Sequence, residues 1–286
     1  MPRKPEGAKL SYVDAFINPF KLQLQQPKIL LIGMLNWIPL LLMAFFLSGL
    51  VSRYMPIMKQ FSSAGKPADP KEFAVLLPKL FKVFLDYLPQ LILLGIIAFV
   101  LYNIMLLAFT HIVIQKYRSK NSNEPKISLS EAFNVALGKV LTLIAATLWM
   151  LLVMLLIIIA AILLITFGAF LGPFVIIVAL LVGIGLIFSF LILGFAGMIL
   201  EIVLLTENKG GRQTAVNAIT FAWKNKFQAS LLVIGYFLAF VILGSVADMF
   251  EAIPVAGTII GMLLGLPITA WSAMAQAEIY YAMRSR

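Results

Sequence analysis

Six long apolar runs are the feature that most constrains how this chain folds. A helix that crosses a bilayer needs about 20 mostly apolar residues, because it rises about 1.5 Å per residue through a hydrocarbon core about 30 Å thick. Backbone groups in lipid must be hydrogen-bonded within their own segment, which favours helices. The sequence therefore predicts an all-α polytopic membrane bundle of six transmembrane helices in a single membrane domain, residues 1–286. The runs cover approximately residues 29–52, 88–114, 139–167, 174–205, 227–247 and 255–283.

The composition supports the membrane class. Hydrophobic residues make up 62% of the chain and charged residues only 12%, whereas soluble domains are about half apolar and about a quarter charged. The chain has no cysteine and one histidine, which excludes disulfides, thiolate metal sites and metal sites built from several histidines. We therefore expect no metal ion and no cofactor.

The distribution of basic residues predicts the orientation of the chain. The formal net charge is +10, which in a soluble protein would favour a nucleic-acid partner. In a membrane protein it follows from the accumulation of Lys and Arg in cytoplasmic segments. Sixteen of the 22 basic residues fall in the N-terminal segment, the C-terminus and the loops before the third and fifth runs. We predict a multi-pass protein of the cell (plasma) membrane with both termini in the cytoplasm and no nucleic-acid partner.

The segment before the second run, residues 71–89, has apolar residues at helical spacing. The pattern predicts an amphipathic helix that lies in the outer interface, with Pro78 as a kink. A lid or a docking surface is the alternative function. The apolar positions are Phe73, Leu76, Leu77, Leu80, Phe81, Phe84, Leu85 and Leu88.

A similar segment precedes each odd-numbered run, at residues 11–21, 128–139 and 214–226. Each has a polar residue, then Ala, then an apolar residue, with Lys six or seven positions after the Ala. This predicts three tandem repeats of an amphipathic cytoplasmic helix plus a helix pair, over about residues 11–114, 128–205 and 214–283. The expected N-caps are Ser11, Ser128 or Ser130, and Thr214. The lysines expected at anionic lipid headgroups are Lys21, Lys28, Lys139, Lys224 and Lys226.

Three ionisable residues recur near the ends of the even-numbered runs: His111, Glu201 and Glu278. Ionisable groups in membrane segments are costly, so they are functional hypotheses by default. If the repeats pack around a common axis, the three could converge to bind a cation or relay a proton. Alternatively, each carboxylate pairs with a lysine of a neighbouring pre-span helix and anchors that helix. Both interpretations stay open at the level of sequence.

Other polar and small residues have structural interpretations. Asn36 and Asn103 are expected to hydrogen-bond neighbouring helices, with a place on a solute path as the alternative. Proline and the glycines of the fourth run predict kinks or tilt, and small residues four apart predict close helix packing. The kinking prolines are Pro39 and Pro267, and the four glycines are Gly183, Gly185, Gly194 and Gly197. The small-residue sets are Gly168 with Gly172, and Gly257, Gly261 and Gly265, the second also being a candidate face for a homo- or hetero-oligomer.

The pre-span Ala-Phe and Ala-Ile segments and the C-terminal PITAWSAMAQAEIYYAMRSR (267–286) carry a family resemblance. The chain resembles a group of poorly characterised six-span proteins. The group includes the membrane domain of some glycerophosphodiester phosphodiesterases and related stand-alone bacterial and archaeal membrane proteins. The resemblance implies this architecture but no activity, because the phosphodiesterase barrel and its catalytic carboxylates have no counterpart here.

The chemical motifs point to no reaction. The chain has no phosphate-binding loop motif, no zinc-protease motif and no serine-hydrolase elbow, and NKGGR (208–212) is interpreted as a turn. No catalytic residue is therefore assigned. The leading hypothesis is a non-enzymatic membrane-organising protein or partner subunit whose basic interfacial helices bind anionic lipid. The alternative is a small-solute, ion or lipid transporter or channel-like protein with His111, Glu201 and Glu278 on its path.

Overall fold

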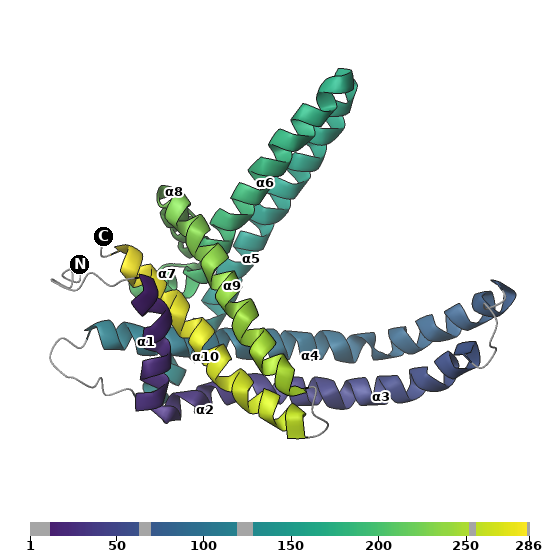
Figure 1. Ribbon diagram of the computed structural model, residues 1–286, viewed down its shortest axis with the longest axis horizontal. Helices are drawn as coiled ribbons and strands as arrows, with labels where there is room; N and C mark the ends of the chain where they lie inside the picture. Colours follow the sequence, from purple (N-terminus) through teal and green to yellow (C-terminus); the bar gives the residue numbers. More distant parts are fainter. Residues whose placement is uncertain (1–11, 63–69, 119–127, 252–255, 285–286) are drawn as a thin grey trace. The chain divides into compact units, whose positions relative to one another are not determined.

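The computed structural model describes residues 12–62, 70–118, 128–251 and 256–284 (Figure 1). All regular structure in these ranges is helical, which confirms the all-α prediction. The α-helices are α1 (Tyr12–Gln25), α2 (Leu30–Gly33), α3 (Trp37–Ser62), α4 (Pro70–Arg118), α5 (Leu129–Gly168), α6 (Val175–Met198), α7 (Leu200–Glu207), α8 (Gly211–Lys224), α9 (Lys226–Glu251) and α10 (Ala256–Arg284). The 3₁₀ helices are η1 (Pro27–Ile29), η2 (Met34–Asn36) and η3 (Ala169–Phe174).

Five stretches of the described chain are long and apolar enough to cross a membrane. They correspond to the first five predicted runs, and the protein is therefore an integral membrane protein in contact with the lipid bilayer. The sixth run coincides with α10, which is not among the five, so the six-span count and the tandem repeats stay predictions. The candidate spans are Pro27–Pro56, Phe81–Lys116, Leu129–Gly168, Val175–Met198 and Lys226–Val246.

The chain divides into two compact units. Unit 1 consists of Met1–Gly33 and Asn103–Arg286, and unit 2 consists of Met34–Tyr102. Helix α4 contributes to both, because its residues up to Tyr102 belong to unit 2 and those from Asn103 onward belong to unit 1.

The core of unit 1 is a seam of small residues. Helix α8 buries Thr214 and three alanines, and it packs against α5, α6 and α7. Alanines at helical spacing let helix backbones approach closely, which favours packing where lipid supplies no hydrophobic driving force. The buried alanines of α8 are Ala215, Ala218 and Ala222, those of α5 include Ala132, Ala136 and Ala146, and those of α10 include Ala270, Ala273, Ala277 and Ala282.

Helix α10 lies beside α9 and is crossed by α1 (Figure 1). The indole N–H of Trp271 donates to the backbone oxygen of Phe16 at 2.8 Å, and the Gln23 amide donates to the backbone oxygen of Pro267 at 3.2 Å. Pro267 lies inside α10. The carbonyl that receives the Gln23 bond therefore belongs to a proline within this helix, and the two bonds attach α1 to α10.

Local backbone chemistry explains where α5 and α8 begin. The predicted N-cap Ser128 is confirmed, because its hydroxyl oxygen accepts the backbone N–H of Glu131 at 3.2 Å. The predicted N-cap Thr214 is wrong, because α8 begins three residues earlier, at Gly211, after the N-cap Gly210. The Thr214 hydroxyl instead donates to the backbone oxygen of Gly210 at 3.1 Å.

The α5–α6 hairpin turns at Gly172, where φ is 62° and ψ is −129° (Figure 1). This conformation is open to glycine and strained for other residues. A Cβ on Gly168 would lie 2.9 Å from a methyl carbon of Val178, so Gly168 permits close packing of α5 on α6. The most apolar 18-residue stretches of α5 and α6 are only 11% and 6% buried within the protein. Most of their apolar side chains therefore face lipid.

Two runs break near the glycines and the proline expected to bend them. The fourth run breaks at Ile199, two residues after Gly197, where φ is −105° and ψ is 2°. The first run contains the short helices η1 and η2, and η2 ends at Asn36, in the turn before Pro39.

The segment 71–89, expected as an amphipathic helix kinked at Pro78, is helical and continues without a break into the second span. Helix α4 runs unbroken for 49 residues, through Pro78 and Pro89, into the second span. At about 1.5 Å per residue it is more than twice as long as the hydrocarbon core is thick. The side chains of Phe73, Leu76, Leu77 and Leu80 lie outside the described residues.

Candidate functional site

The predicted polar residues are distributed over several helices. In unit 1, His111 and Asn103 lie on α4, Glu201 on α7 and Glu278 on α10. Asn36 is the last residue of η2, in unit 2. Among the described residues, no group of three or more His, Cys, Asp or Glu side chains is arranged to hold a metal ion.

Glu278 forms a buried ion pair. Its carboxylate is 1% exposed and lies 2.9 Å from the ammonium of Lys116, whose side chain is 29% exposed. Lys116 follows the end of the second apolar run rather than lying on a pre-span helix. The pair therefore ties α10 to the C-terminal end of α4, a contact that the sequence did not predict.

His111 faces the start of α5. Its Nε2 lies 3.6 Å from a carboxylate oxygen of Glu131 and 3.1 Å from the amide nitrogen of Gln115. Glu131 lies in the segment predicted to precede the third run, at the start of α5. This contact therefore joins α4 to that segment. His111 thus contacts Glu131 of α5, whereas Glu278 of α10 pairs with Lys116 of α4.

Glu201 is the most unusual of the predicted residues. It is 1% exposed, and neither carboxylate oxygen has a hydrogen-bond partner among the described residues. It lies on α7, beyond the candidate span that ends at Met198. Burial raises the pKa of its carboxyl from 4.5 to about 8, so the neutral acid predominates near neutral pH.

Tyr236 on α9 interacts electrostatically with Glu201, and its hydroxyl accepts a hydrogen bond from the Gln276 amide at 3.2 Å. The Tyr236 ring stacks on Trp271 with centroids 5.8 Å apart. A carboxyl in these surroundings is stable as the protonated form, which carries no charge to solvate.

Replacing Glu201 by glutamine is expected to stabilise the protein by an amount that grows as pH rises from 4.5 to about 8. Because the folded-state pKa lies above the unfolded value of 4.5, the folded state binds more protons between pH 4.5 and about 8. Stability from this group is thus present below pH 4.5 and is lost as pH rises through about 8. Melting curves in detergent should coincide near pH 5 and diverge in favour of Glu201→Gln by pH 9.

The control for this experiment is Glu207→Gln, which changes an exposed carboxylate on the same helix and keeps a side-chain oxygen for the hydrogen bond from the Asn217 amide. It should not reproduce the gain in melting temperature that Glu201→Gln shows as pH rises. Parallel pH profiles for Glu201→Gln and the unchanged protein would show that Glu201 does not take up a proton on folding.

The five lysines expected at lipid headgroups fall into two groups. Lys139 donates a hydrogen bond to the side-chain oxygen of Asn208, the left-handed residue that ends α7, and is only partly exposed. The other four are exposed: Lys21, Lys28, Lys224 and Lys226.

Helix α1 has a face that is apolar and exposed. Val13, Ile17 and Leu24 are exposed at helical spacing, and Lys21 shares this face. Ala15 and Leu22 on the opposite face are buried. A helix that lies in a membrane interface typically has exposed apolar residues beside a lysine on one face. Its opposite face is buried against the protein.

Helix α8 and the start of α9 show the same arrangement with aromatic residues. Trp223 is 60% exposed and Phe227 is 69% exposed. The ammonium of Lys226 lies 5.5 Å from the Trp223 ring centroid and 5.9 Å from that of Phe227. Exposed Trp with Lys beside it is typical of headgroup depth, where an aromatic body contacts acyl chains and a polar edge contacts water.

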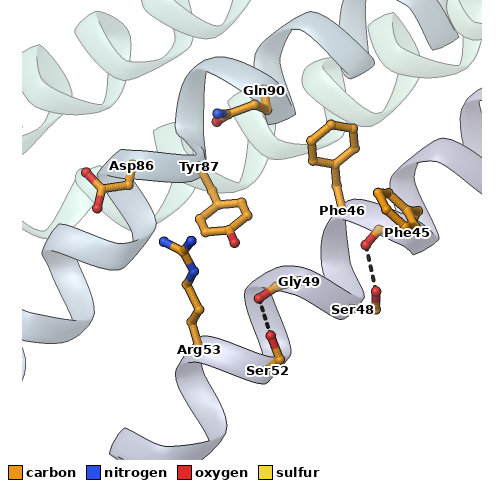
Figure 2. Close-up of a pocket in the computed structure, with 9 residues that line it drawn as sticks. All are labelled: Phe45, Phe46, Ser48, Gly49, Ser52, Arg53, Asp86, Tyr87 and Gln90. Carbon is orange, nitrogen blue, oxygen red and sulfur yellow. Dashed lines mark hydrogen bonds between the residues drawn. The ribbon is translucent and has the colours of Figure 1, made fainter.

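Unit 2 contains a groove that the sequence did not predict (Figure 2). Its volume is about 610 Å³, and it lies between α3 and α4. Charged residues that flank the apolar runs were the available sequence signal, since Arg53 directly follows the first run and Asp86 lies just before the second. The lining residues are Phe45, Phe46, Ser48, Gly49, Ser52, Arg53, Asp86, Tyr87 and Gln90.

None of the five predicted polar residues lines this groove. The proposed oligomer face is only partly described, because the side-chain surroundings of Gly257 and Gly261 lie outside the described residues. At Gly265 an added Cβ would meet no atom within 4 Å, so no described neighbour requires glycine there.

No protein-family model, curated protein or solved structure matches this chain. Its function is therefore inferred from the contacts and exposed surfaces of the molecule alone.

Proposed function

We propose that this integral membrane protein is a non-enzymatic membrane-organising protein or partner subunit that holds anionic lipid at the cytoplasmic interface. Its lipid-binding elements are the exposed faces of α1 and α8. The observation that supports this most is the exposed surface at the end of α8 and the start of α9, called the α8 face, where Trp223 and Phe227 lie beside Lys224 and Lys226.

The packing of both helices supports this proposal. Each helix has one face buried in the protein core, and its opposite, apolar and basic face is exposed. A lysine close to an anionic surface contributes about 1 kcal/mol, and apolar residues inserted at the interface add to this. The four exposed lysines together favour anionic over zwitterionic lipid.

The test uses Trp223 as the probe. Acyl-chain-brominated phosphatidylglycerol and phosphatidylcholine quench tryptophans that they touch, and subtracting a Trp223→Phe variant isolates the Trp223 signal. We expect the combined Lys224→Gln and Lys226→Gln variant to lose most of the preference of Trp223 for the anionic lipid, because both charges beside the probe are gone.

A matched variant removes the same charge elsewhere, at exposed Lys59 and Lys209. It should keep the preference seen for the unchanged protein. Equal loss in both variants would mean that overall charge, rather than the α8 face, determines which lipid is bound.

Transport is the second candidate function, and Glu201 is the observation that favours it. A buried carboxyl without a hydrogen-bond partner is a group that can take up and release a proton. If Glu201 lies on a proton or cation path, Glu201→Gln will stay folded and abolish flux into liposomes. Flux that is absent from the unchanged protein, or unaffected by the substitution, would remove this candidate.

A further inference from the structure

We propose that the groove of unit 2 binds the headgroup of a zwitterionic phospholipid that carries a primary amine, with its phosphate on Arg53 and its ammonium on Asp86. This site uses other residues than the basic faces of α1 and α8. Its proposed ligand is a zwitterionic lipid, whereas those faces are proposed to bind anionic lipid. Its failure would leave the proposal for α1 and α8 unaffected.

Three of the six polar side chains of the groove are hydrogen-bonded to backbone, and Figure 2 shows the bonds of the two serines. The Ser48 hydroxyl donates to the backbone oxygen of Phe45 at 2.7 Å, and the Ser52 hydroxyl donates to that of Gly49 at 2.8 Å. The Gln90 amide, oriented to satisfy its nitrogen, donates to two backbone oxygens of α4 at 2.9 and 3.0 Å. The charged groups of Arg53 and Asp86 are therefore the main recognition elements left to a ligand.

Arg53 is held by an aromatic ring rather than by a carboxylate. Its guanidinium carbon lies 5.5 Å from the Tyr87 ring centroid. An added Cβ at Gly49 would lie 3.5 Å from the Tyr87 hydroxyl, so the tyrosine lies against α3 at this glycine. A guanidinium stacked on a ring face keeps its N–H edge available, and that edge matches the paired oxygens of a phosphate.

Asp86 supplies the opposite charge on the facing helix (Figure 2). The described residues contain no ion pair within 4.0 Å between Asp86 and Arg53, or between either of them and another residue. A cation and an anion that line one groove without pairing complement a ligand with both charges. Phosphoethanolamine has a phosphate anion and an ammonium with three N–H donors.

The depth of the groove identifies the source of this ligand as lipid. Arg53 lies near the end of the span Pro27–Pro56, and Asp86 lies near the start of the span Phe81–Lys116. Charged groups inside a span are costly unless they meet complementary charge near the interface. Phe45, which is 74% exposed, and Phe46 offer apolar surface to acyl chains.

The groove also has a suitable size. Its volume of about 610 Å³ falls within the range of about 300–1,000 Å³ typical of small-molecule sites. A lipid that has the phosphate but lacks the amine would satisfy Arg53 and leave Asp86 facing an anion. Discrimination between amine-bearing and glycerol-bearing headgroups is therefore expected to come from Asp86.

The experiment titrates the purified protein in detergent with three lipids of identical acyl chains and counts bound lipid by native mass spectrometry. The lipids are phosphatidylethanolamine, phosphatidylcholine and phosphatidylglycerol. We expect phosphatidylethanolamine to bind most tightly at this site. Arg53→Gln should weaken its binding about 10-fold, the effect expected for loss of a hydrogen bond to a charged group. Asp86→Asn should weaken phosphatidylethanolamine binding similarly while leaving phosphatidylglycerol binding unchanged or tighter.

Two further variants separate recognition from folding. Arg53→Lys keeps the charge without the planar fork, so it should bind with intermediate affinity, and Lys59→Gln should bind like the unchanged protein. Equal binding of all three lipids by the unchanged protein, or unaltered binding in Arg53→Gln and Asp86→Asn, would overturn the proposal. Equal weakening of every lipid by Asp86→Asn would also overturn it, as would competition by soluble glycerophosphoethanolamine as effectively as by the lipid.

Discussion

Replacing Lys116 by methionine is expected to destabilise the protein by about 3 kcal/mol, the low end of the cost of removing one partner from a buried ion pair. The reason is asymmetric burial, since Glu278 is 1% exposed and Lys116 is 29% exposed. Methionine fills the space of the lysine stem but leaves the buried carboxylate without the ammonium 2.9 Å away. The measurement is the melting temperature or denaturation midpoint of purified protein in detergent.

A double-mutant cycle identifies the charge pair as the cause. Glu278→Gln should cost less than Lys116→Met, because the remaining lysine reaches water while the remaining carboxylate does not. The double variant should be more stable than Lys116→Met alone, since the buried charge has been removed. Additive losses, or a Lys116→Met protein as stable as the original, would contradict a structural role for this pair.

Replacing Gly211 by alanine is the second large effect, with an expected loss of about 2 kcal/mol typical of overpacking. The added Cβ would lie 2.8 Å from the Ala145 Cβ, 2.9 Å from the Ala146 backbone nitrogen and 3.0 Å from the Thr142 backbone oxygen. Two of these three neighbours are backbone atoms of α5, which cannot move aside as a flexible side chain can. The start of α8 must therefore shift away from α5.

The neighbouring glycine provides the control. Gly210 has φ −66° and ψ 161°, an ordinary extended conformation, and an added Cβ there would meet no atom within 4 Å. Gly210→Ala should therefore cost well under half as much as Gly211→Ala, through weaker capping alone. Equal melting temperatures for the two variants would show that α8 does not approach α5 as closely as the structure has it.

The membrane class could be predicted from the sequence because it depends on segment length and apolarity. The first five runs agree closely with the five candidate spans of the structure. The Ser128 cap was also predictable, since a serine three residues before a glutamate is a local signal. Pro78 was misleading, because it is accommodated inside α4.

Contacts between helices were less accessible to sequence reasoning. The pattern placed His111, Glu201 and Glu278 at similar positions along their runs, but the structure gives each different surroundings. Partner choice depends on how helices far apart in sequence pack, which periodicity does not encode. The groove was missed for the same reason, because Arg53 and Tyr87 come together only when α3 and α4 pair.

We propose that the α8 face lies against anionic lipid. Quenching of Trp223 fluorescence by brominated lipid is the most direct test of this contact. In bilayers that contain brominated phosphatidylglycerol or brominated phosphatidylcholine at equal mole fraction, the Trp223 signal of the unchanged protein should be quenched more strongly by the anionic lipid. Raising the salt concentration should reduce this difference, because surface charges are screened. Equal quenching by the two lipids, or no quenching by either, would contradict the proposed role of this face.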